Sequence, residues 1–140
     1  MNYLVYLDTS TGELEKILSG IKCMLIKELD PVQAAGHTVC PGDNLYFLRS
    51  KDNYDLRVKA TVSRILSFKN HRDEDLCQTL KEFQPRLQLT EDQYNNWSEK
   101  QRVLLVEFEC AQKIEAIHVA PNKVVDRSDW IRFEKLEEIT

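Results

Sequence analysis

The stretch LRVKATVSRI, residues 56–65, decides the fold class. Its apolar side chains fall at every second position from Leu56 to Val62, and polar side chains occupy the positions between them. Because successive side chains of a β-strand point to opposite faces, this pattern predicts a strand with one face in the core and one in solvent. The apolar positions change phase at Arg64 and Ile65, which predicts a β-bulge or bend there. A strand bent in this way suits a sheet that curls into a barrel.

Other segments have the β-branched and aromatic composition that is typical of strands. They cover residues 3–7, 22–29, 44–50 and 102–110, and residues 113–119 either continue the last strand or pair with it. In the strand at 102–110, period-two spacing predicts one shared face for Leu104, Val106, Phe108 and Cys110.

Helical patterns occupy residues 10–18, 70–83 and 90–100. Capping-box spacing predicts that the first helix begins at Ser10 and the third at Thr90. Pro85 is expected to end the second helix, because proline lacks the amide hydrogen that the helix ladder needs. Apolar residues three apart in the tail, beginning at Trp130, predict a turn or short helix that packs on the body.

Together these elements predict a single domain over residues 1–140 of the α+β class. Strands that cluster around a helical insert favour a small mixed β-barrel of about five or six strands flanked by helices. With 42% hydrophobic and 30% charged residues, the composition is that of a soluble globular domain with a substantial core.

Composition also excludes several classes of protein. No apolar run approaches the length of a membrane span, and the N-terminus lacks a basic signal region, so we expect a cytoplasmic protein with no membrane partner and, by default, a monomer. The four cysteines form no C-x-x-C pair and are expected to be reduced thiols. His37 and Cys40 lack a second ligand pair at zinc spacing, so we expect no metal or other cofactor.

Charge is unevenly distributed along the chain. The net charge is −4, but residues 1–72 carry +2 and residues 73–140 carry −6. This balance argues against indiscriminate nucleic-acid binding and permits a local basic surface on an acidic protein.

Four segments carry a resemblance to a known family. GIKCMLIK, PGDNLYFLRS, RVKATVSRI and VLLVEFE follow one another between residues 3 and 120 in an order that resembles the ASCH branch of the PUA-like superfamily. The resemblance implies a barrel flanked by helices, with a cleft that accepts RNA, a nucleotide or a modified base in relatives. The family signature Gly-x-Lys-x-x-Glu-x-Arg stands here as Gly20-x-Lys22-x-x-Leu25-x-Lys27.

The resemblance also bears on catalysis. Some small members are amidohydrolases that deacylate N4-acetylcytidine with a lysine, a threonine three residues later and a distant glutamate. Lys22 fits the lysine, but Leu25 stands where the threonine is required. Because leucine is neither a nucleophile nor a proton carrier, we expect no enzyme activity, with a deacylase or a ribonuclease on the same scaffold as the alternative.

The resemblance therefore points to a binding module. We expect RNA or a nucleotide-like small molecule as the partner, with a site formed by Lys22, Lys27, Arg49, Ser50 and Trp130. In this hypothesis Lys22 is the central cation at the mouth of the cleft, and Trp130 stacks a base.

Structural explanations compete with each of these roles. Lys22 is alternatively a solvated lysine at the start of a strand, and Trp130 a packing residue of the tail. The polar face from Arg57 to Ser63 and the pair Glu107 and Glu109 are explained as solvated strand faces. A third alternative is a protein-interaction module that uses the acidic C-terminal half and binds no nucleotide.

Overall fold

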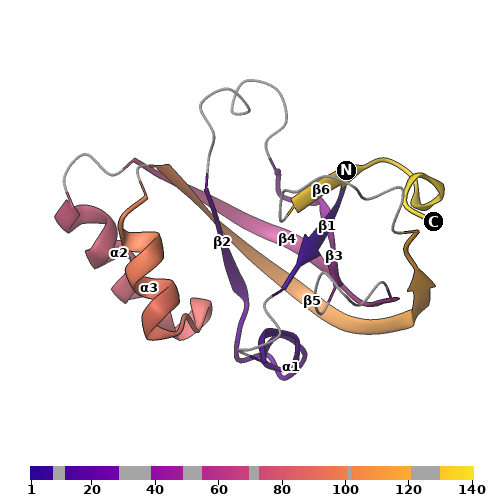
Figure 1. Cartoon of the computed structure of the whole chain (residues 1–140), viewed down its shortest axis with the longest axis horizontal. Helices are drawn as coiled ribbons and strands as arrows, with labels where there is room; N and C mark the ends of the chain where they lie inside the picture. Colours follow the sequence, from indigo (N-terminus) through magenta and orange to yellow (C-terminus); the bar gives the residue numbers. More distant parts are fainter. Residues whose placement is uncertain (8–11, 29–38, 49–54, 70–72, 101, 121–129) are drawn as a thin grey trace.

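Six strands form one curled sheet in the computed structural model (Figure 1). The structure describes residues 1–7, 12–28, 39–48, 55–69, 73–100, 102–120 and 130–140. The elements are β1 (Asn2–Tyr6), α1 (Glu13–Leu18), β2 (Met24–Glu28), β3 (Asn44–Leu48), β4 (Asp55–Lys69), α2 (Asp73–Leu87), α3 (Glu91–Ser98), β5 (Arg102–His118), β6 (Trp130–Phe133) and a short 3-10 helix (Leu136–Glu138).

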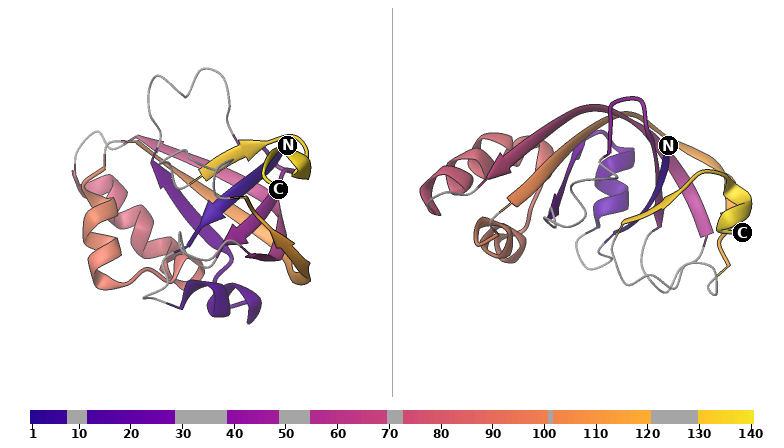
Figure 2. Two further views of the ribbon diagram at one scale, coloured as in Figure 1. Left: turned by 45° about the vertical axis from the view of Figure 1, so that its right-hand side comes forward. Right: turned by 90° about the horizontal axis from the view of Figure 1, so that it is seen from above.

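The strand order is β2-β5-β4-β3-β1-β6, so β2 and β6 are the two ends of the sheet. Only β1 and β3 pair in parallel among these strands, and the other neighbours are antiparallel. Seen from above, the sheet arches into a half-barrel with α1 beneath the arch (Figure 2). This confirms the α+β fold with a curled mixed sheet that the sequence predicts.

Bulges in the long β4–β5 ribbon explain the curvature. Ser63 is an extra residue in β4, because Val62 pairs with Phe108 while Arg64 pairs with the adjacent Glu107. The predicted phase change is therefore confirmed, one residue earlier than expected. A second register shift lies beside Leu56, which packs in a different cluster from Val58 although the alternation predicted a shared face.

Cys110 marks a third bulge, this time in β5. Its φ of 57° lies in the left-handed region, and two residues of β5 stand opposite one residue of β4 there. Cys110 is consequently exposed, whereas period-two spacing predicted that it would share the buried face of Phe108. A bulge re-aims the side chains that follow it, and a regular alternation cannot reveal this.

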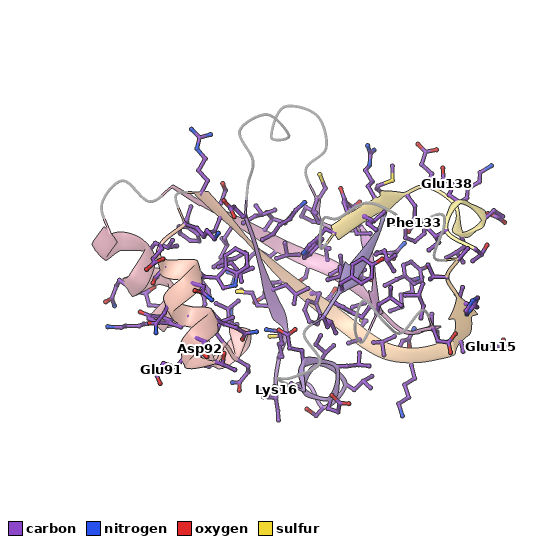
Figure 3. All side chains as sticks on the ribbon, viewed as in Figure 1. Lys16, Glu91, Asp92, Glu115, Phe133 and Glu138 are labelled. Carbon is purple, nitrogen blue, oxygen red and sulfur yellow. The ribbon has the colours of Figure 1, made fainter. Side chains whose placement is uncertain are left out.

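Three apolar clusters hold the elements together. The inner face of the curled sheet packs against Leu14 and Ile17 of α1. Leu80 and Leu87 of α2 pack against Leu105 of β5, and apolar residues of α3 pack on the same cluster. This cluster lies at the end of the sheet seen on the left of Figure 1. The C-terminal segment closes the remaining end, where Phe133 of β6 lies with its ring centroid 5.6 Å from that of Tyr46 (Figure 3).

Two helix boundaries differ from the predictions. Helix α1 begins at Glu13 with Gly12 as its N-cap, and the predicted cap Ser10 lies outside the described residues. Helix α2 continues through Pro85 to Leu87, because the burial of Leu87 offsets the hydrogen bond that proline removes. The capping box at Thr90 is confirmed. Glu91 and Asp92 in the first turn of α3 project outward beside the positive end of the helix (Figure 3).

The tail is also different from the prediction. Residues 130–133 form β6, which pairs antiparallel with β1, and only the last turn is helical. Trp130 and Phe133 are three residues apart and pack in different clusters, as residues on opposite faces of a strand do. Their spacing fits both a helix and a strand. The segment forms a strand because its backbone pairs with the edge of β1.

Candidate ligand-binding site

Lys22 lies in the interior at the junction between α1 and β2. Gly20 adopts a φ of 83° after α1, and the backbone amide of Lys22 then donates to the carbonyl of Lys16 at 3.0 Å. This turn directs the lysine side chain inward, and only 1% of Lys22 is exposed. Both interpretations of the sequence placed its ammonium in contact with solvent or ligand, and the structure buries it.

Two partners from separate helices hold that ammonium. Its Nζ atom lies 3.6 Å from Oε1 of Glu13, the first residue of α1, and donates a hydrogen bond to the carbonyl oxygen of Leu87, the last residue of α2. Lys22 therefore ties both helices to the start of β2. Glu13 lies three residues after Ser10, the spacing that predicted a capping box, and nothing in the sequence indicated this contact with Lys22.

Burial lowers the pKa of the Lys22 ammonium, and the charge of Glu13 opposes that change. A lysine of this kind loses its proton at a lower pH than an exposed one does. The residue three positions later, Leu25, is buried in the apolar cluster on the inner face. It offers no hydroxyl for the deacylation chemistry that the sequence resemblance raised as an alternative.

Lys27 and Trp130 lie together although 102 residues separate them in sequence. Lys27 belongs to β2 and Trp130 to β6, the two end strands of the sheet. The Nζ atom of Lys27 lies over the indole, 5.4 Å from the ring centroid. This cation–π contact joins the two ends of the half-barrel.

Tyr3 supports the indole from the neighbouring strand. Its ring stands edge-on to Trp130, with 6.1 Å between the ring centroids and 65° between the planes. Burial, followed by the charge of Asp43, raises the pKa of the Tyr3 phenol. Tyr3 therefore stays neutral beside the indole at ordinary pH. The sequence identified Tyr3 only as a strand residue.

Lys27 differs from Lys22 in its surroundings. It is half-buried, and burial alone lowers the pKa of its ammonium. Among the residues that the structure describes, no carboxylate or carbonyl pairs with the Lys27 ammonium; its contact is the indole of Trp130. A half-buried cation without a counter-ion attracts an anion more strongly than a solvated lysine does.

The predicted site residues thus separate into groups. Lys27 and Trp130 come together at the ends of the sheet, and Lys22 lies behind the surface with its own partners. Arg49 and Ser50 lie outside the described residues, so their roles stay predictions.

Glu107 of β5 forms a second group of charges together with two arginines. One oxygen of Glu107, Oε2, lies 2.9 Å from Arg86 and 3.4 Å from Arg64. Both guanidinium groups are about half exposed, so the cluster resembles a surface ion-pair network and not a paired-acid site. Glu109 is exposed on the strand, as the solvated-face explanation expects.

The described residues contain neither a metal-ligand cluster nor a helix suited to crossing a membrane. Within the described ranges, no three histidine, cysteine or carboxylate side chains are grouped as a metal site requires. Over the same part of the chain, none of the helices combines the length and apolar character that crossing a membrane needs.

Crystal structures of ASCH from Zymomonas mobilis share this fold. The unmutated Zymomonas protein superposes on this chain with a TM-score of 0.70 at 12% identity. The superposition covers 98% of this chain and 90% of that chain. A serine-to-alanine variant gives a TM-score of 0.71 at 13% identity, with coverage of 97% and 90%. A tyrosine-to-phenylalanine variant gives 0.70 at 13% identity, with coverage of 97% and 92%.

The resemblance to ASCH proteins is therefore confirmed at the level of the fold. This chain has the fold of the Zymomonas mobilis ASCH structures over almost its whole length. It matches no protein-family model and no curated protein in sequence.

Proposed function

We propose that this chain is a non-catalytic ASCH-type module that binds a nucleotide-like ligand, or a short unpaired RNA segment, at the Lys27–Trp130 pair. The observation that carries the proposal is the position of the Lys27 ammonium, 5.4 Å from the centroid of the Trp130 ring. An aromatic face beside a cation matches a base beside its phosphate, because bases stack on indoles and phosphates pair with ammonium groups.

The size of the charged surface supports a small ligand. Lys27 supplies one cation at this place, and the chain as a whole has a net charge of −4. Long duplexes are bound by rows of lysine and arginine that neutralise many phosphates. One cation and one aromatic ring suit a single nucleotide or an unpaired base with its phosphate.

Lys22 acts behind this site in the proposal. Its ammonium is buried and shared between Glu13 and the Leu87 carbonyl, so it holds α1 and α2 against the start of β2. The same strand carries Lys27. Lys22 is thus a positioning residue for β2, and Lys27 takes the contact role that the sequence assigned to Lys22.

A deacylase on this scaffold is a second candidate, favoured by one observation. Burial lowers the pKa of Lys22, as a proton acceptor in amide hydrolysis requires. The buried Leu25 speaks against it, since the hydroxyl of the related enzymes is missing. Release of cytidine from N4-acetylcytidine by the purified protein, lost in a Lys22→Met variant, would replace the binding proposal with this one.

The test of the binding proposal is a titration of the purified protein with nucleosides, mononucleotides and a short unstructured RNA. Calorimetry gives the affinity, and Trp130 fluorescence in a Trp97→Phe background reports on the site. Lys27→Ala should weaken nucleotide binding about tenfold, as expected for one charge-assisted contact. Because Lys27 is the one cation that the described residues place at this site, affinity for single-stranded RNA should fall only about two- to threefold between 50 and 200 mM salt.

Lys59→Ala is the matched control. Lys59 also lies over an aromatic ring, 5.6 Å from the Tyr46 centroid, but its partner is on the adjacent strand β3 and not across the ends of the sheet. This variant should bind like the parent. If no nucleoside, nucleotide or RNA binds the parent, the proposal fails and the protein-interaction alternative takes its place.

A further inference from the structure

The Lys27 ammonium occupies the position that a stacked base would need. Stacked aromatic rings place their centroids about 4.5–7 Å apart. The Nζ atom of Lys27 is 5.4 Å from the centroid of the Trp130 ring, which is within the same range. A base and the ammonium therefore compete for this face of the indole.

The indole is the fixed member of this pair, and the lysine is the mobile one. Trp130 is held in β6 by its pairing with Val5 of β1 and by edge-to-face packing against Tyr3. Lys27 reaches the ring through a four-carbon stem with many rotamers, so its ammonium can move while the backbone of β2 stays in place.

A displaced ammonium needs a new partner. The Lys27 ammonium pairs with no carboxylate among the described residues, so leaving the indole costs it the contact it has. A cation–π contact contributes a few-fold to about tenfold to an equilibrium constant. A neutral nucleoside must offset that loss by stacking alone, whereas a ligand with a phosphate offers the ammonium a stronger partner.

We infer that Lys27 is an internal occupant of the Trp130 face, which a base displaces, and that the ligand carries a phosphate to which the displaced ammonium moves. The inference rests on the proposed nucleotide-binding function and narrows it to nucleoside monophosphates and the phosphate-bearing unpaired nucleotides of RNA. Neutral nucleosides are disfavoured. Lys27 then has opposite effects on the two parts of the ligand, since it attracts the phosphate and competes with the base.

This opposition gives a sharp test. The four ribonucleosides and their 3′- and 5′-monophosphates are titrated into the parent, Lys27→Ala and Lys59→Ala proteins. The parent should bind the preferred monophosphate about tenfold more tightly than its nucleoside. Lys27→Ala should remove this preference, with nucleoside affinity unchanged or raised a few-fold because the indole face is vacated. Lys59→Ala should keep the preference of the parent.

A second readout follows the lysine itself. Protons above an aromatic ring are shifted upfield, so the ε-methylene protons of Lys27 should resonate upfield in the free protein and return toward their ordinary frequency when the monophosphate binds. If they stay upfield in a saturated complex, the displacement is wrong.

Two further outcomes distinguish a failure of this inference from a failure of the proposed nucleotide-binding function. Equal affinity of the parent for nucleoside and monophosphate, or an equal loss of both in Lys27→Ala, overturns the inference and leaves nucleotide binding standing. Absence of binding by every ligand to the parent overturns both.

Discussion

The Nζ atom of Lys22 lies 3.6 Å from Oε1 of Glu13, and the pair joins the first residue of α1 to the segment that follows the same helix. Only 1% of the Lys22 side chain and 12% of the Glu13 side chain are exposed. The Lys22 ammonium also donates a hydrogen bond to the carbonyl oxygen of Leu87. A buried ion pair contributes little more to stability than a pair of well-packed apolar residues would. Removing one partner alone is costly, because the other charge stays buried without the attraction that offset its desolvation.

Replacement of Lys22 should therefore be costly. Lys22→Met keeps most of the side-chain volume and removes the ammonium that contacts the Glu13 carboxylate and the Leu87 carbonyl. We expect a loss of about 2–4 kcal/mol in the free energy of unfolding, toward the lower end because Glu13 retains some access to water. Urea denaturation of parent and variant measures the difference.

The control for this prediction is an exposed ion pair whose charged atoms lie closer together than those of Lys22 and Glu13. Lys100 and Glu28 lie 3.2 Å apart, but their side chains are 41% and 54% exposed. Lys100→Ala should cost no more than about 0.5 kcal/mol, because water screens an exposed pair. A Lys22→Met, Glu13→Gln double variant should recover part of the loss. Equal costs at Lys22 and Lys100 would contradict a structural role for the buried pair.

The stability contributed by Lys22 should depend on pH in the alkaline range. Burial, opposed by the charge of Glu13, lowers the pKa of Lys22 in the folded protein below its ordinary value of 10.5. Between these two pKa values the unfolded chain binds more protons, so the free energy of unfolding rises with pH. The stability difference between parent and Lys22→Met should therefore grow as pH rises toward 10.5 and level off above it.

The measurement is urea denaturation of both proteins at several alkaline pH values. The titration of other groups, including Lys27 and Tyr3, occurs in both proteins and cancels in the difference. A difference that shrinks as pH rises would mean that the ion pair with Glu13 dominates and that the pKa of Lys22 is raised.

Periodicity was sufficient to predict the middle of strand β4 and its bulge. The alternation from Val58 to Val62 and its change of phase gave both a half-buried strand and its bulge, because strand geometry allows only one arrangement of such a pattern. The capping box at Thr90 was equally predictable, since it depends on residues three apart in sequence. Local rules determine features of this kind.

The site depends on contacts that no local rule contains. Lys22 is buried because α1 and α2 converge on it, and lysine alone in a sequence predicts exposure. Lys27 meets Trp130 because the sheet curls until its two end strands face each other. The resemblance to ASCH proteins identified both Lys22 and Lys27 as candidates, but their surroundings required the three-dimensional fold.

The N-terminus of α3 offers a test of local stability. Thr90 Oγ1 accepts from the backbone amide of Gln93 at 3.2 Å, and Gln93 Oε1 accepts from the amide of Thr90 at 3.0 Å. Thr90→Ala should lower the free energy of unfolding by about 1 kcal/mol because the Gln93 amide at the start of the helix loses its acceptor. Thr90→Ser keeps the hydroxyl and should cost much less. Chemical denaturation compares the variants, and equal losses would show that the methyl group and not the hydrogen bond is responsible.

Cys110 tests the bulge in β5. Its φ of 57° is unfavourable for side chains in general and worst for β-branched residues. Cys110→Gly should therefore leave stability unchanged or raise it by up to about 1 kcal/mol, and Cys110→Val should lower it by about 1–2 kcal/mol. The exposed neighbour Glu109 is the control, because valine is favourable on an extended strand and Glu109→Val should change stability by less than about 0.5 kcal/mol.

These variants separate backbone strain from side-chain contacts, since Cys110 is exposed and its side chain contributes little to the core. If valine is tolerated at 110 as well as at 109, the backbone there is extended, and the curl of the β4–β5 ribbon must come from the bulge at Ser63 and the shift beside Leu56. If glycine stabilises and valine destabilises, the left-handed residue is a fixed element of the fold. The curvature that brings Lys27 to Trp130 then depends on it.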